Sequence, residues 1–418
     1  MSGGDENSFL LHGARCLFDF ACPLEEDLSI RNGRIERIVP APASTKSFKS
    51  KDDLVDLNGY LVLPGLINAH DHLEFALYPR LAEPPYRNYT EWGEDIHAKF
   101  AAEIEKQKSV PKTVRIMWGA IRNLLSGVTT VCHHNPLLPE MLSPEFPVGV
   151  ISAFGWAHSL ALGGDLRAAR ARTPEGHPFI VHACEGADDF ARGELWQLDS
   201  MGLLDKDTVL VHALATDSEG VALIRTRGSA VIACPSSNKF LFNALPDLKN
   251  MLRMDRVALG SDSPLTAIGD LLDEMCFAIR ECDVSPKQAF DMVTRSAAEI
   301  LRLQNGEGQI QEGGVADLVV IRDSGVDFSE RMRRLSSGDI ELVMIGGRVH
   351  AISEELYQHL PAHMTAGLEL LSVGEMERWV RAPISDLVEI TKNALGQTGA
   401  MLGGKKISAP VHGVAYAC

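Results

Sequence analysis

The apolar positions of this chain follow two different rhythms. Short β-branched runs separated by turn residues open the sequence and return late in it: "SFLLHGARCLF", "LSIRNGRIERIV", "DLVDLNGYLVLPG", "VADLVVIRDSG" and "IELVMIGGRVHAI". The dipeptide Asn32-Gly33 lies between the apolar segments of the second run, and it supplies the positive φ values that a tight hairpin turn needs. These runs predict strands near both ends of the chain.

Between those regions, longer apolar runs recur, many of them separated by helical patterns. They are "YLVLPGLINAH", "GVTTVCHH", "FPVGVISAFGW", "PFIVHACE", "DTVLVHALA", "GSAVIACPSSN" and "RVALGSDSP". Continuous β-branched runs bounded by turn residues are typical of strands that are buried on both faces of a parallel sheet. Their alternation with helices predicts an α/β protein whose βα units close into a (β/α)8 TIM-like barrel.

A (β/α)8 barrel needs eight strands, but only these seven runs are convincing strands. The weakest region is residues 155–178, where "SLALG" is a candidate for a short, degraded strand. We therefore expect either a barrel that is distorted there or an eighth strand that the pattern hides. After residue 350 the pattern "SVGEMERWVRAPISDLVEITKNALG" predicts a helical tail that packs on the barrel or on a neighbouring subunit. The second alternative would make the protein a homodimer.

Length, composition and charge exclude several function classes. With 418 residues, 45% of them hydrophobic, the chain can bury one large core and a smaller satellite domain. Its formal net charge of -16 argues against nucleic acid or an anionic membrane as the main partner, because both need a positive surface. No apolar run approaches the length of a membrane span, the first residues lack a signal-peptide layout, and the eight cysteines are scattered. We expect a cytoplasmic protein with reduced thiols.

Polar side chains stand where several of the apolar runs end. They are His70, His72, His182, Glu185, His212 and Asp262. Catalytic groups of a parallel barrel lie at the carboxyl ends of its strands. Positions i and i+2 of a strand face the same side, so His70 and His72 project together into the barrel mouth while Asp71 turns away.

Two imidazoles so placed can share one cation, and His182 and Asp262 can complete the ligand set. Three imidazoles and a carboxylate suit zinc, with iron and manganese as alternatives, and they leave a position open for water. A single histidine at a strand end is more often a hydrogen-bonded structural residue. The combination of a His-x-His pair, two later histidines and an aspartate at successive strand ends favours one divalent metal.

The motifs that carry these residues resemble those of the amidohydrolase superfamily, above all its cytosine, guanine and S-adenosylhomocysteine deaminase-like branch. The motifs are "PGLINAHDH", "IVHACE", "LVHA", "CPSSN" and "LGSDS", and the resemblance covers most of the chain. It implies a metal-dependent hydrolase of carbon–nitrogen bonds other than peptide bonds, with a small β-sandwich built from both chain ends. We accordingly expect a sandwich from residues 1–61 and 306–352, a barrel from 62–305 and a helical tail from 353–418.

The resemblance also implies a role for each motif residue. His70, His72, His182 and Asp262 would bind a single divalent metal. Glu185 would be the proton shuttle, and His212 would lie beside the metal-bound water and polarise the substrate. Dinuclear branches use a carboxylated lysine, and because "FPVGVISAFGWAHSL" contains no lysine, a mononuclear centre is favoured.

The chemistry of these residue types leads to the same activity. A bound metal can lower the pKa of its water to about 7, and Asp262 can accept the proton as general base. The hydroxide would attack an sp2 carbon that carries nitrogen, and Glu185 would protonate that nitrogen. We favour hydrolytic deamination of an aminated heterocycle, a small-molecule substrate. The main alternative is a hydrolase that opens a cyclic amide or releases another leaving group, and a remote one is a catalytically inactive binding protein.

Several further residues are weaker candidates for substrate contacts. They are Glu74, His134, Trp156, His158 and Asn238. Each has a plainer alternative, such as capping a helix for Glu74, packing in the barrel for Trp156 or holding a loop for Asn238. Either His133 or His134 can reach the barrel mouth.

Three features depart from the family pattern. Gly186 follows Glu185 where known deaminases commonly have threonine, the segment before "HPFIVHACE" is short, and Ser263 follows Asp262. The short segment removes part of the usual pocket wall. These departures leave the metal residues intact, but they weaken the inference from the family that the substrate is a nucleobase.

Overall fold

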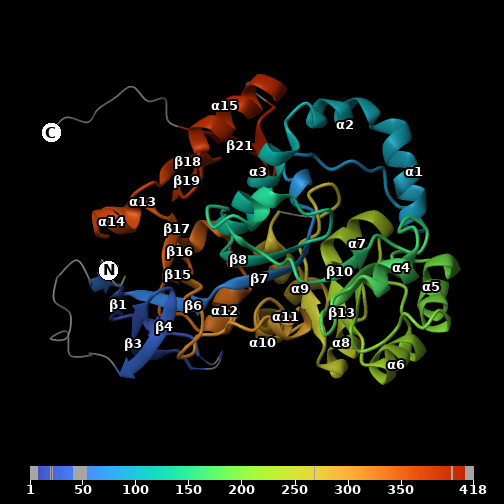
Figure 1. The fold of residues 1–418 in the computed structure, drawn as a ribbon, viewed down its shortest axis with the longest axis horizontal. Helices are drawn as coiled ribbons and strands as arrows, with labels where there is room; N and C mark the ends of the chain where they lie inside the picture. Colours follow the sequence, from blue (N-terminus) through green and yellow to red (C-terminus); the bar gives the residue numbers. More distant parts are fainter. Residues whose placement is uncertain are drawn as a thin grey trace.

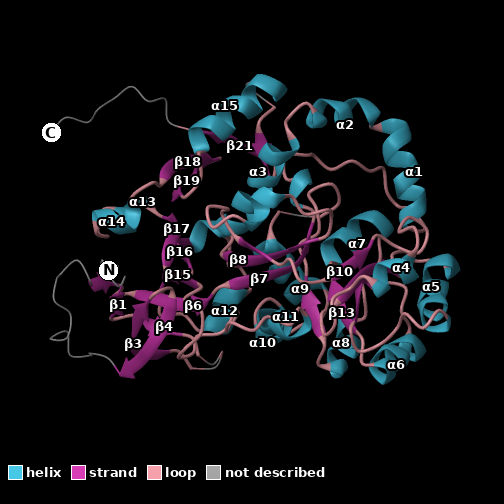
Figure 2. Ribbon diagram, viewed as in Figure 1, coloured by secondary structure: helices cyan, strands magenta, loops and turns pink. Residues whose placement is uncertain are grey.

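The computed structural model describes residues 8–18, 20, 22–40, 54–267, 269–396 and 399–409. Among these residues, eight strands form two parallel sheets, with the orders β7-β8-β9 and β10-β11-β12-β13-β14 (Figures 1 and 2). The strands are β7 (Leu66–Asp71), β8 (Val128–His133), β9 (Gly149–Val150), β10 (Gly155–Ala157), β11 (Phe179–Ala183), β12 (Thr208–His212), β13 (Ala230–Ala233) and β14 (Val257–Leu259). The predicted mixed α/β architecture with parallel sheets is confirmed.

The strand missing from the sequence pattern is not "SLALG", so that prediction was wrong. Residues 159–163 form a turn, whereas the single run "FPVGVISAFGW" contains both β9 and β10. β9 pairs with β8 and β10 pairs with β11, so this run passes from one parallel sheet to the other. With two and three residues, these strands are too short for a pattern to separate them.

The two parallel sheets approach each other again where β14 lies beside β7. The backbone N–H of Asp262 donates to the carbonyl of His70 at 3.1 Å. Gly260 makes this approach possible, because a Cβ at that position would lie 2.5 Å from the Cβ of His70. The backbone after β14 is thereby held against the first histidine of the His-x-His pair.

Helices follow most of these strands, and further helices lie between the later strands of the chain (Figure 1). They are α1 (Tyr89–Lys99), α2 (Ala101–Lys108), α3 (Lys112–Leu125), α4 (Leu166–Ala171), α5 (Asp189–Ser200), α6 (Ser218–Arg227), α7 (Pro235–Phe242), α8 (Leu248–Met251), α9 (Leu271–Glu281), α10 (Pro286–Met292), α11 (Arg295–Ile300), α12 (Phe328–Met332), α13 (Glu354–Tyr357), α14 (Ala362–Thr365) and α15 (Ile384–Leu395). Aspartates cap several helices that follow strands: Asp188 before α5, Asp217 before α6 and Asp270 before α9 each accept a backbone N–H of the first turn.

A larger sheet collects strands from both ends of the chain. Its order is β20-β21-β18-β19-β17-β16-β15-β6-β2-β3-β1-β5, and β4 also pairs with β3. The strands are β1 (Ser8–His12), β2 (Arg15–Cys16), β3 (Leu24–Arg31), β4 (Arg34–Pro40), β5 (Leu54–Asp56), β6 (Tyr60–Pro64), β15 (Leu318–Arg322), β16 (Ile340–Ile345), β17 (Arg348–Ile352), β18 (Glu369–Val373), β19 (Met376–Val380), β20 (Met401–Leu402) and β21 (Lys405–Ser408). Antiparallel pairing of β6 with β15 joins the two ends.

The hairpin predicted at Asn32-Gly33 is confirmed, because both residues have positive φ between β3 and β4. The helical tail was only partly right. The segment "SVGEMERWV" belongs to the β18–β19 hairpin, whose turn contains Gly374 at φ +62°, so it extends the large sheet. Helix α15 does contact the rest of the molecule, since the indole N–H of Trp118 in α3 donates to Thr391 Oγ1 at 2.8 Å. Residues 410–418 lie outside the described residues.

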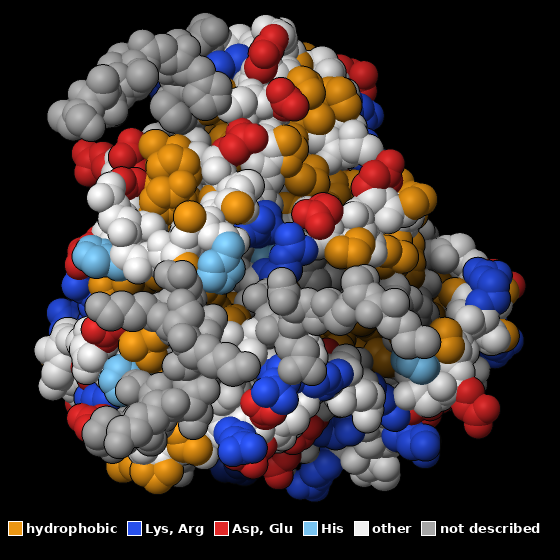
Figure 3. All heavy atoms as spheres, turned by 60° about the vertical axis from the view of Figure 1, so that its left-hand side comes forward, with side chains coloured by type: hydrophobic (Ala, Val, Ile, Leu, Met, Phe, Trp, Pro, Cys, Tyr) orange, Lys and Arg blue, Asp and Glu red, His pale blue; other side chains and the backbone are white. Residues whose placement is uncertain are grey.

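Two features of the structure are relevant to nucleic acid and membranes, the partners that the sequence argues against. None of the described helices combines the length and the apolar character that crossing a bilayer requires. On the face shown in Figure 3, the Lys and Arg side chains of the described residues are interspersed with Asp and Glu side chains.

Candidate active site

The histidines and the aspartate predicted from the strand ends converge in the structure. The Nε2 atoms of His70 and His182 lie 3.3 Å apart. Asp262 Oδ1 lies 3.9 Å from His70 Nε2 and 3.8 Å from His72 Nε2. These donors come from β7, from β11 and from the loop after β14, so the carboxyl ends of strands distant in sequence build one cluster.

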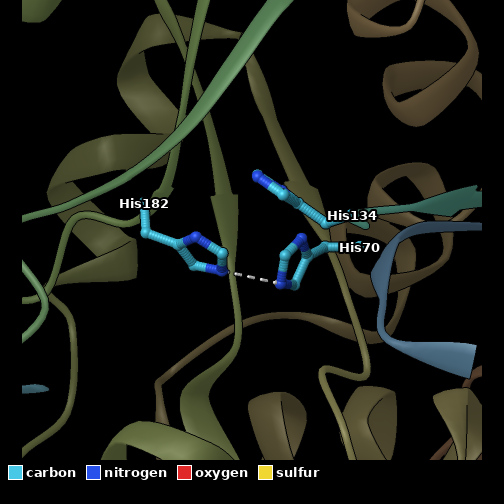
Figure 4. Close-up of side chains that lie close together, drawn as sticks. All are labelled: His70, His134 and His182. Carbon is cyan, nitrogen blue, oxygen red and sulfur yellow. Dashed lines mark hydrogen bonds between the residues drawn. The ribbon is translucent and has the colours of Figure 1, made fainter. Parts of the chain in front are cut away.

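The cluster contains two overlapping groups that could hold a cation. One is His70, His72 and Asp262, and the other is His70, His134 and His182; within each group the donor atoms lie within 4.8 Å of one another. Figure 4 shows the second group, in which His182 and His70 point toward each other and the His134 side chain lies beside His70. His134, expected as a substrate contact, is therefore fully buried among the candidate ligands.

The state of these imidazoles fits a divalent metal. Burial lowers the pKa of His70, His134 and His182 well below the usual histidine value, and the neighbouring imidazoles lower it further, so each ring is neutral near pH 7. The Nδ1 of His182 lies 2.7 Å from the carbonyl of His158, which fixes a proton on Nδ1 and leaves the Nε2 lone pair facing His70. Two neutral imidazole nitrogens facing each other at 3.3 Å are the arrangement that a shared cation stabilises.

His134 has the opposite tautomer. Its Nε2 lies 3.1 Å from the carbonyl of Ala157 and therefore carries the proton, and its Nδ1 is buried without a hydrogen-bond partner. The Trp156 ring packs edge-on against it, with the ring centres 5.3 Å apart. Trp156 thus packs against the His134 ring of the cluster.

Glu185 and His212 form a second pair beside the cluster. Glu185 Oε2 lies 3.6 Å from His212 Nε2, and the side-chain amide of Asn238 contacts His212 Nδ1 at 3.1 Å. Burial raises the pKa of Glu185 well above its usual value, and the charges of Asp262 and Glu194 raise it further. Burial also lowers the pKa of His212 to about 4. The pair combines a carboxyl group that binds its proton more tightly than usual with an imidazole that is neutral near pH 7.

The side chain of Asp262 is held at both oxygens. Ser237 Oγ donates to Oδ2 at 2.7 Å, and the backbone N–H of Ser263 donates to Oδ1 at 2.8 Å. Four non-glycine residues at these strand ends have left-handed backbones, namely Cys184 at φ +56°, His212 at +72°, Ala213 at +49° and Asp262 at +51°. Such conformations cost free energy and cluster at functional sites, where surrounding contacts impose them.

A buried ion pair behind the ligands was not anticipated. Asp71 does turn away from the cluster, and its Oδ2 accepts from Arg122 Nη2 at 2.8 Å and from Asn123 Nδ2 at 2.6 Å. The same Arg122 nitrogen donates to the carbonyl of Asp262 at 3.1 Å and to Ser261 Oγ at 2.9 Å. Helix α3 therefore holds β7 and the β14 loop in position. Two polar residues on the apolar face of "IMWGAIRNLL" were the available signal.

The ligand cluster opens into a cavity of about 440 Å³. Of the weaker candidates, Glu74 and His158 line it, as do His72, His182, Glu185, His212 and Asp262. The described residues that line the cavity do not include His134, Trp156 or Asn238. Burial by itself would raise the pKa of Glu74, but His133 and Lys112, 3.4 and 3.1 Å from its oxygens, lower that pKa to about 2.

A segment that we name the arch, residues 76–111 with helices α1 and α2, supplies much of the cavity wall. Tyr78, Tyr89, Trp92 and Ile96 of the arch line the cavity. In Figure 1, α1 and α2 lie outside the parallel strands.

The arch also explains Gly186, one of the departures from the family pattern. Gly186 forms a β-bridge with Asn88, and the N–H of Tyr89 donates to the carbonyl of Glu185 at 3.1 Å. A Cβ on Gly186 would lie 2.8 Å from the backbone of Arg87 and Asn88. A threonine would therefore collide with the arch.

Glu194, on α5, is a further residue that the sequence did not reveal. Its Oε1 accepts from the Tyr89 hydroxyl at 2.7 Å and its Oε2 from the backbone N–H of Cys184 at 2.8 Å. Burial raises the pKa of Glu194 to about 7. Glu194 thereby joins the arch to the turn that carries Glu185. Cys184 itself is buried in packing, and burial raises the pKa of its thiol to about 12, which makes it unreactive.

Comparison with known proteins agrees with this geometry. Residues 156–350 match the model of the amidohydrolase family. A 5-methylthioadenosine/S-adenosylhomocysteine deaminase of Thermococcus sibiricus is 22% identical over 413 aligned positions, which cover 82% of this chain and 92% of the relative.

Solved structures show the same fold. The adenosine deaminase of Xanthomonas campestris with bound zinc gives a TM-score of 0.68 at 18% identity, covering 82% of this chain and 92% of that one. A triazine hydrolase from Arthrobacter aurescens gives a TM-score of 0.68 at 19% identity, covering 93% and 99%. The family match over residues 156–350 and these relatives confirm the resemblance that the motifs carry, and the buried histidine cluster agrees with it.

Proposed function

We propose that this protein is a mononuclear metal-dependent hydrolase that deaminates an aminated heterocycle. The observation that carries the proposal is the convergence of His70, His72, His182 and Asp262 at the end of a cavity that Glu185 also lines. Relatives named as deaminases support the reaction class. Among metals, zinc suits this nitrogen-rich set with one carboxylate best, and iron or manganese would suit it less well.

The ligand set is His70, His72, His182 and Asp262. A divalent metal bound there would supply Lewis acidity that lowers the pKa of water toward neutrality. We place His134 behind this set, because its protonated Nε2 faces the carbonyl of Ala157.

The remaining groups have roles in proton transfer and charge stabilisation. Ser237 and the backbone N–H of Ser263 hold the two oxygens of Asp262, and this oriented carboxylate accepts a proton from the attacking water. Glu185 holds a proton in the cavity and delivers it to the departing nitrogen, which leaves as ammonia. His212, oriented by Asn238, stabilises the negative charge that develops on the substrate.

The finer architecture is part of the same proposal. We assign the eight parallel strands to a distorted (β/α)8 barrel over residues 62–305, interrupted between β9 and β10. The chain order β7 to β14 and the bond from Asp262 N–H to the His70 carbonyl support it. We assign the described strands from residues 1–61 and 306–352 to a β-sandwich, with β18–β21 added to its sheet. The net charge of -16 supports a cytoplasmic protein that acts on a small molecule rather than on nucleic acid or a membrane.

The test is ammonia release by the zinc-loaded protein from aminated purines, pyrimidines, pterins and triazines, with Glu185→Gln in parallel. We expect ammonia from one ring class. The Glu185→Gln protein should keep its metal and its melting temperature and lose about 10²–10⁴-fold in rate. Ammonia release at the wild-type rate from this variant would show that the proton-transfer role is wrong. If the metal-loaded wild type releases no ammonia from any compound of the panel, the alternative function is favoured, a hydrolase that opens a cyclic amide or releases another leaving group.

A further inference from the structure

Arg115 is a buried cation in the wall of the active-site cavity. It lies in the first turn of α3, its side chain lines the cavity, and only 8% of the residue is exposed. Its Nε donates to the carbonyl of Val110 at 3.1 Å, and its Nη1 donates to the carbonyl of Glu74 at 3.0 Å. Both partners are neutral backbone groups, so the guanidinium is held in place without being neutralised.

Within the described part of the chain, no carboxylate lies within 4.0 Å of the Arg115 guanidinium. The nearby carboxylate of Glu74 is engaged elsewhere, with Lys112 at 3.1 Å and His133 at 3.4 Å. A buried charge is costly unless it is paired, and arginine is rarely buried without an acidic partner. The Nη2 donors, which make no bond to the described residues, are therefore available to a ligand in the cavity.

The rest of the cavity is consistent with a ligand that is neutral at one end and anionic at the other. The ring of Tyr78 lies 5.8 Å from the guanidinium carbon of Arg115, and Tyr78, Tyr89 and Trp92 offer faces on which a planar ring can stack. Lys108, at the end of α2, also lines the cavity, but its ammonium group pairs with Glu105 at 2.9 Å. A volume of about 440 Å³ lies within the range of about 300–1,000 Å³ that encloses small-molecule ligands.

We propose that Arg115 is an anion subsite of this cavity, and that the substrate is an aminated heterocycle carrying a carboxylate or phosphate group. This inference rests on the proposed deaminase function and adds a substrate class to it. The metal residues and Glu185 act on the ring, while Arg115 binds the negative charge and fixes the ring's orientation. The guanidinium is suited to this role because it presents fixed N–H donors to a carboxylate or phosphate.

The experiment uses matched substrates and matched variants of the full, zinc-loaded chain. Each ring class is tested as a neutral compound, as the same compound with a carboxylate, and as the same compound with a phosphate; adenosine, adenosine 5′-carboxylate and adenosine 5′-monophosphate are one such set. The variants are Arg115→Gln, Arg115→Lys and Lys106→Gln. Lys106 is a suitable control because it is on α2 near Lys108 and pairs with Glu103, but is not part of the cavity lining.

We expect KM for one anionic compound to be at least ten-fold below that of its neutral match. Arg115→Gln should abolish this advantage with little change in kcat, Arg115→Lys should restore part of it, and Lys106→Gln should leave it intact. The carboxylate and phosphate arms identify which anion is recognised. Equal KM values for neutral and anionic compounds, or an advantage that survives Arg115→Gln, would overturn the proposal.

Binding measured apart from turnover separates this inference from the proposed function. Isothermal titration of the same compounds into the Glu185→Gln protein, with and without Arg115→Lys or Arg115→Gln, reports the subsite even when no compound is deaminated. An anion preference that the Arg115 variants weaken at least ten-fold would support the subsite. Equal affinities for the neutral and anionic compounds would refute it. If thermal melting shows Arg115→Gln to be unfolded, Arg115→Lys decides the outcome.

Discussion

His70 is the residue at which the two candidate ligand groups overlap. It faces His182 at 3.3 Å and Asp262 at 3.9 Å, whereas His134 belongs to one group only and is tied by Nε2 to a carbonyl. A residue common to both groups should be indispensable for the metal. A residue that packs behind them should affect the metal only through the rings it supports.

We predict that His70→Ala loses both metal and activity, whereas His134→Gln retains one metal per chain with less than ten-fold weaker affinity. The physical reason is that His70 contributes a donor atom facing the other ligands, while His134 contributes packing and a backbone hydrogen bond. Metal content by mass spectrometry and a chelator competition titration check both variants. Complete loss of metal from His134→Gln would place that histidine among the ligands.

For single residues, the sequence predicts the features that local geometry dictates. The i, i+2 spacing of His70 and His72 indicates a shared direction, and Asp71 turns away as expected. The positions of His134, Arg122 and Glu194 depend on contacts between segments far apart in the chain. A sequence pattern does not encode such long-range contacts. It therefore predicts only a substrate contact for His134 and gives no role to Arg122 or Glu194.

The arch and the turn after β11 meet backbone to backbone at Gly186. We predict that Gly186→Thr raises KM at least ten-fold and leaves the metal content at one per chain, because a Cβ would lie 2.8 Å from Arg87 and Asn88 and displace the arch. Steady-state kinetics and limited proteolysis within residues 76–111 measure the effect. Gly193→Ala is the control, since only Gln197 approaches within 4 Å of a Cβ there. Unchanged KM and unchanged proteolysis would contradict the contact.

Helix α3 positions the site through the buried pair of Arg122 and Asp71. Arg122→Met leaves the Asp71 carboxylate buried without its cation, which should cost about 3–5 kcal/mol in the free energy of unfolding. Urea denaturation measures the loss, and a metal titration should show weaker binding, because Arg122 also holds the carbonyl of Asp262. Adding Asp71→Asn to this variant should recover part of the stability. A single variant as stable as the wild type would show that the pair contributes little.

For whole strands and helices, length decides what the sequence can predict. Runs such as β11 and β12, five residues each and fully buried, are recognisable from their apolar content. The short strands β9 and β10 share one apolar run, so the pattern counted them once. In the β18–β19 hairpin, polar residues on the partly exposed strands resemble a helical pattern, and only pairing with β17 and β21 makes the segment a sheet.

Across the whole molecule, one buried acid outside the active site couples stability to pH. Asp317, before β15, accepts from the backbone N–H of Gly346 at 2.8 Å, and burial raises its pKa to about 7. The unfolded chain releases this proton near pH 4 and the folded chain near pH 7. The contribution of Asp317 to the free energy of unfolding therefore falls as pH rises from about 4 to 7 and is constant above.

Asp317→Asn keeps an acceptor for Gly346 and removes this titration. We predict that the unfolding free energy of the variant minus that of the wild type is about 2–4 kcal/mol larger at pH 8 than at pH 5. Urea denaturation of both proteins at the two pH values gives the difference directly. A difference in unfolding free energy that is the same at pH 5 and pH 8 would show that Asp317 ionises normally.

In the proposed mechanism, the histidine cluster holds one divalent metal, and deamination requires that metal. The most direct measurement is ammonia released from the best aminated heterocycle as zinc is titrated into metal-free protein, with bound zinc measured in the same samples. We predict that the rate rises in proportion to bound zinc and saturates at one zinc per chain. Ammonia release that is independent of zinc, or saturation at two zinc ions per chain, would contradict the mechanism.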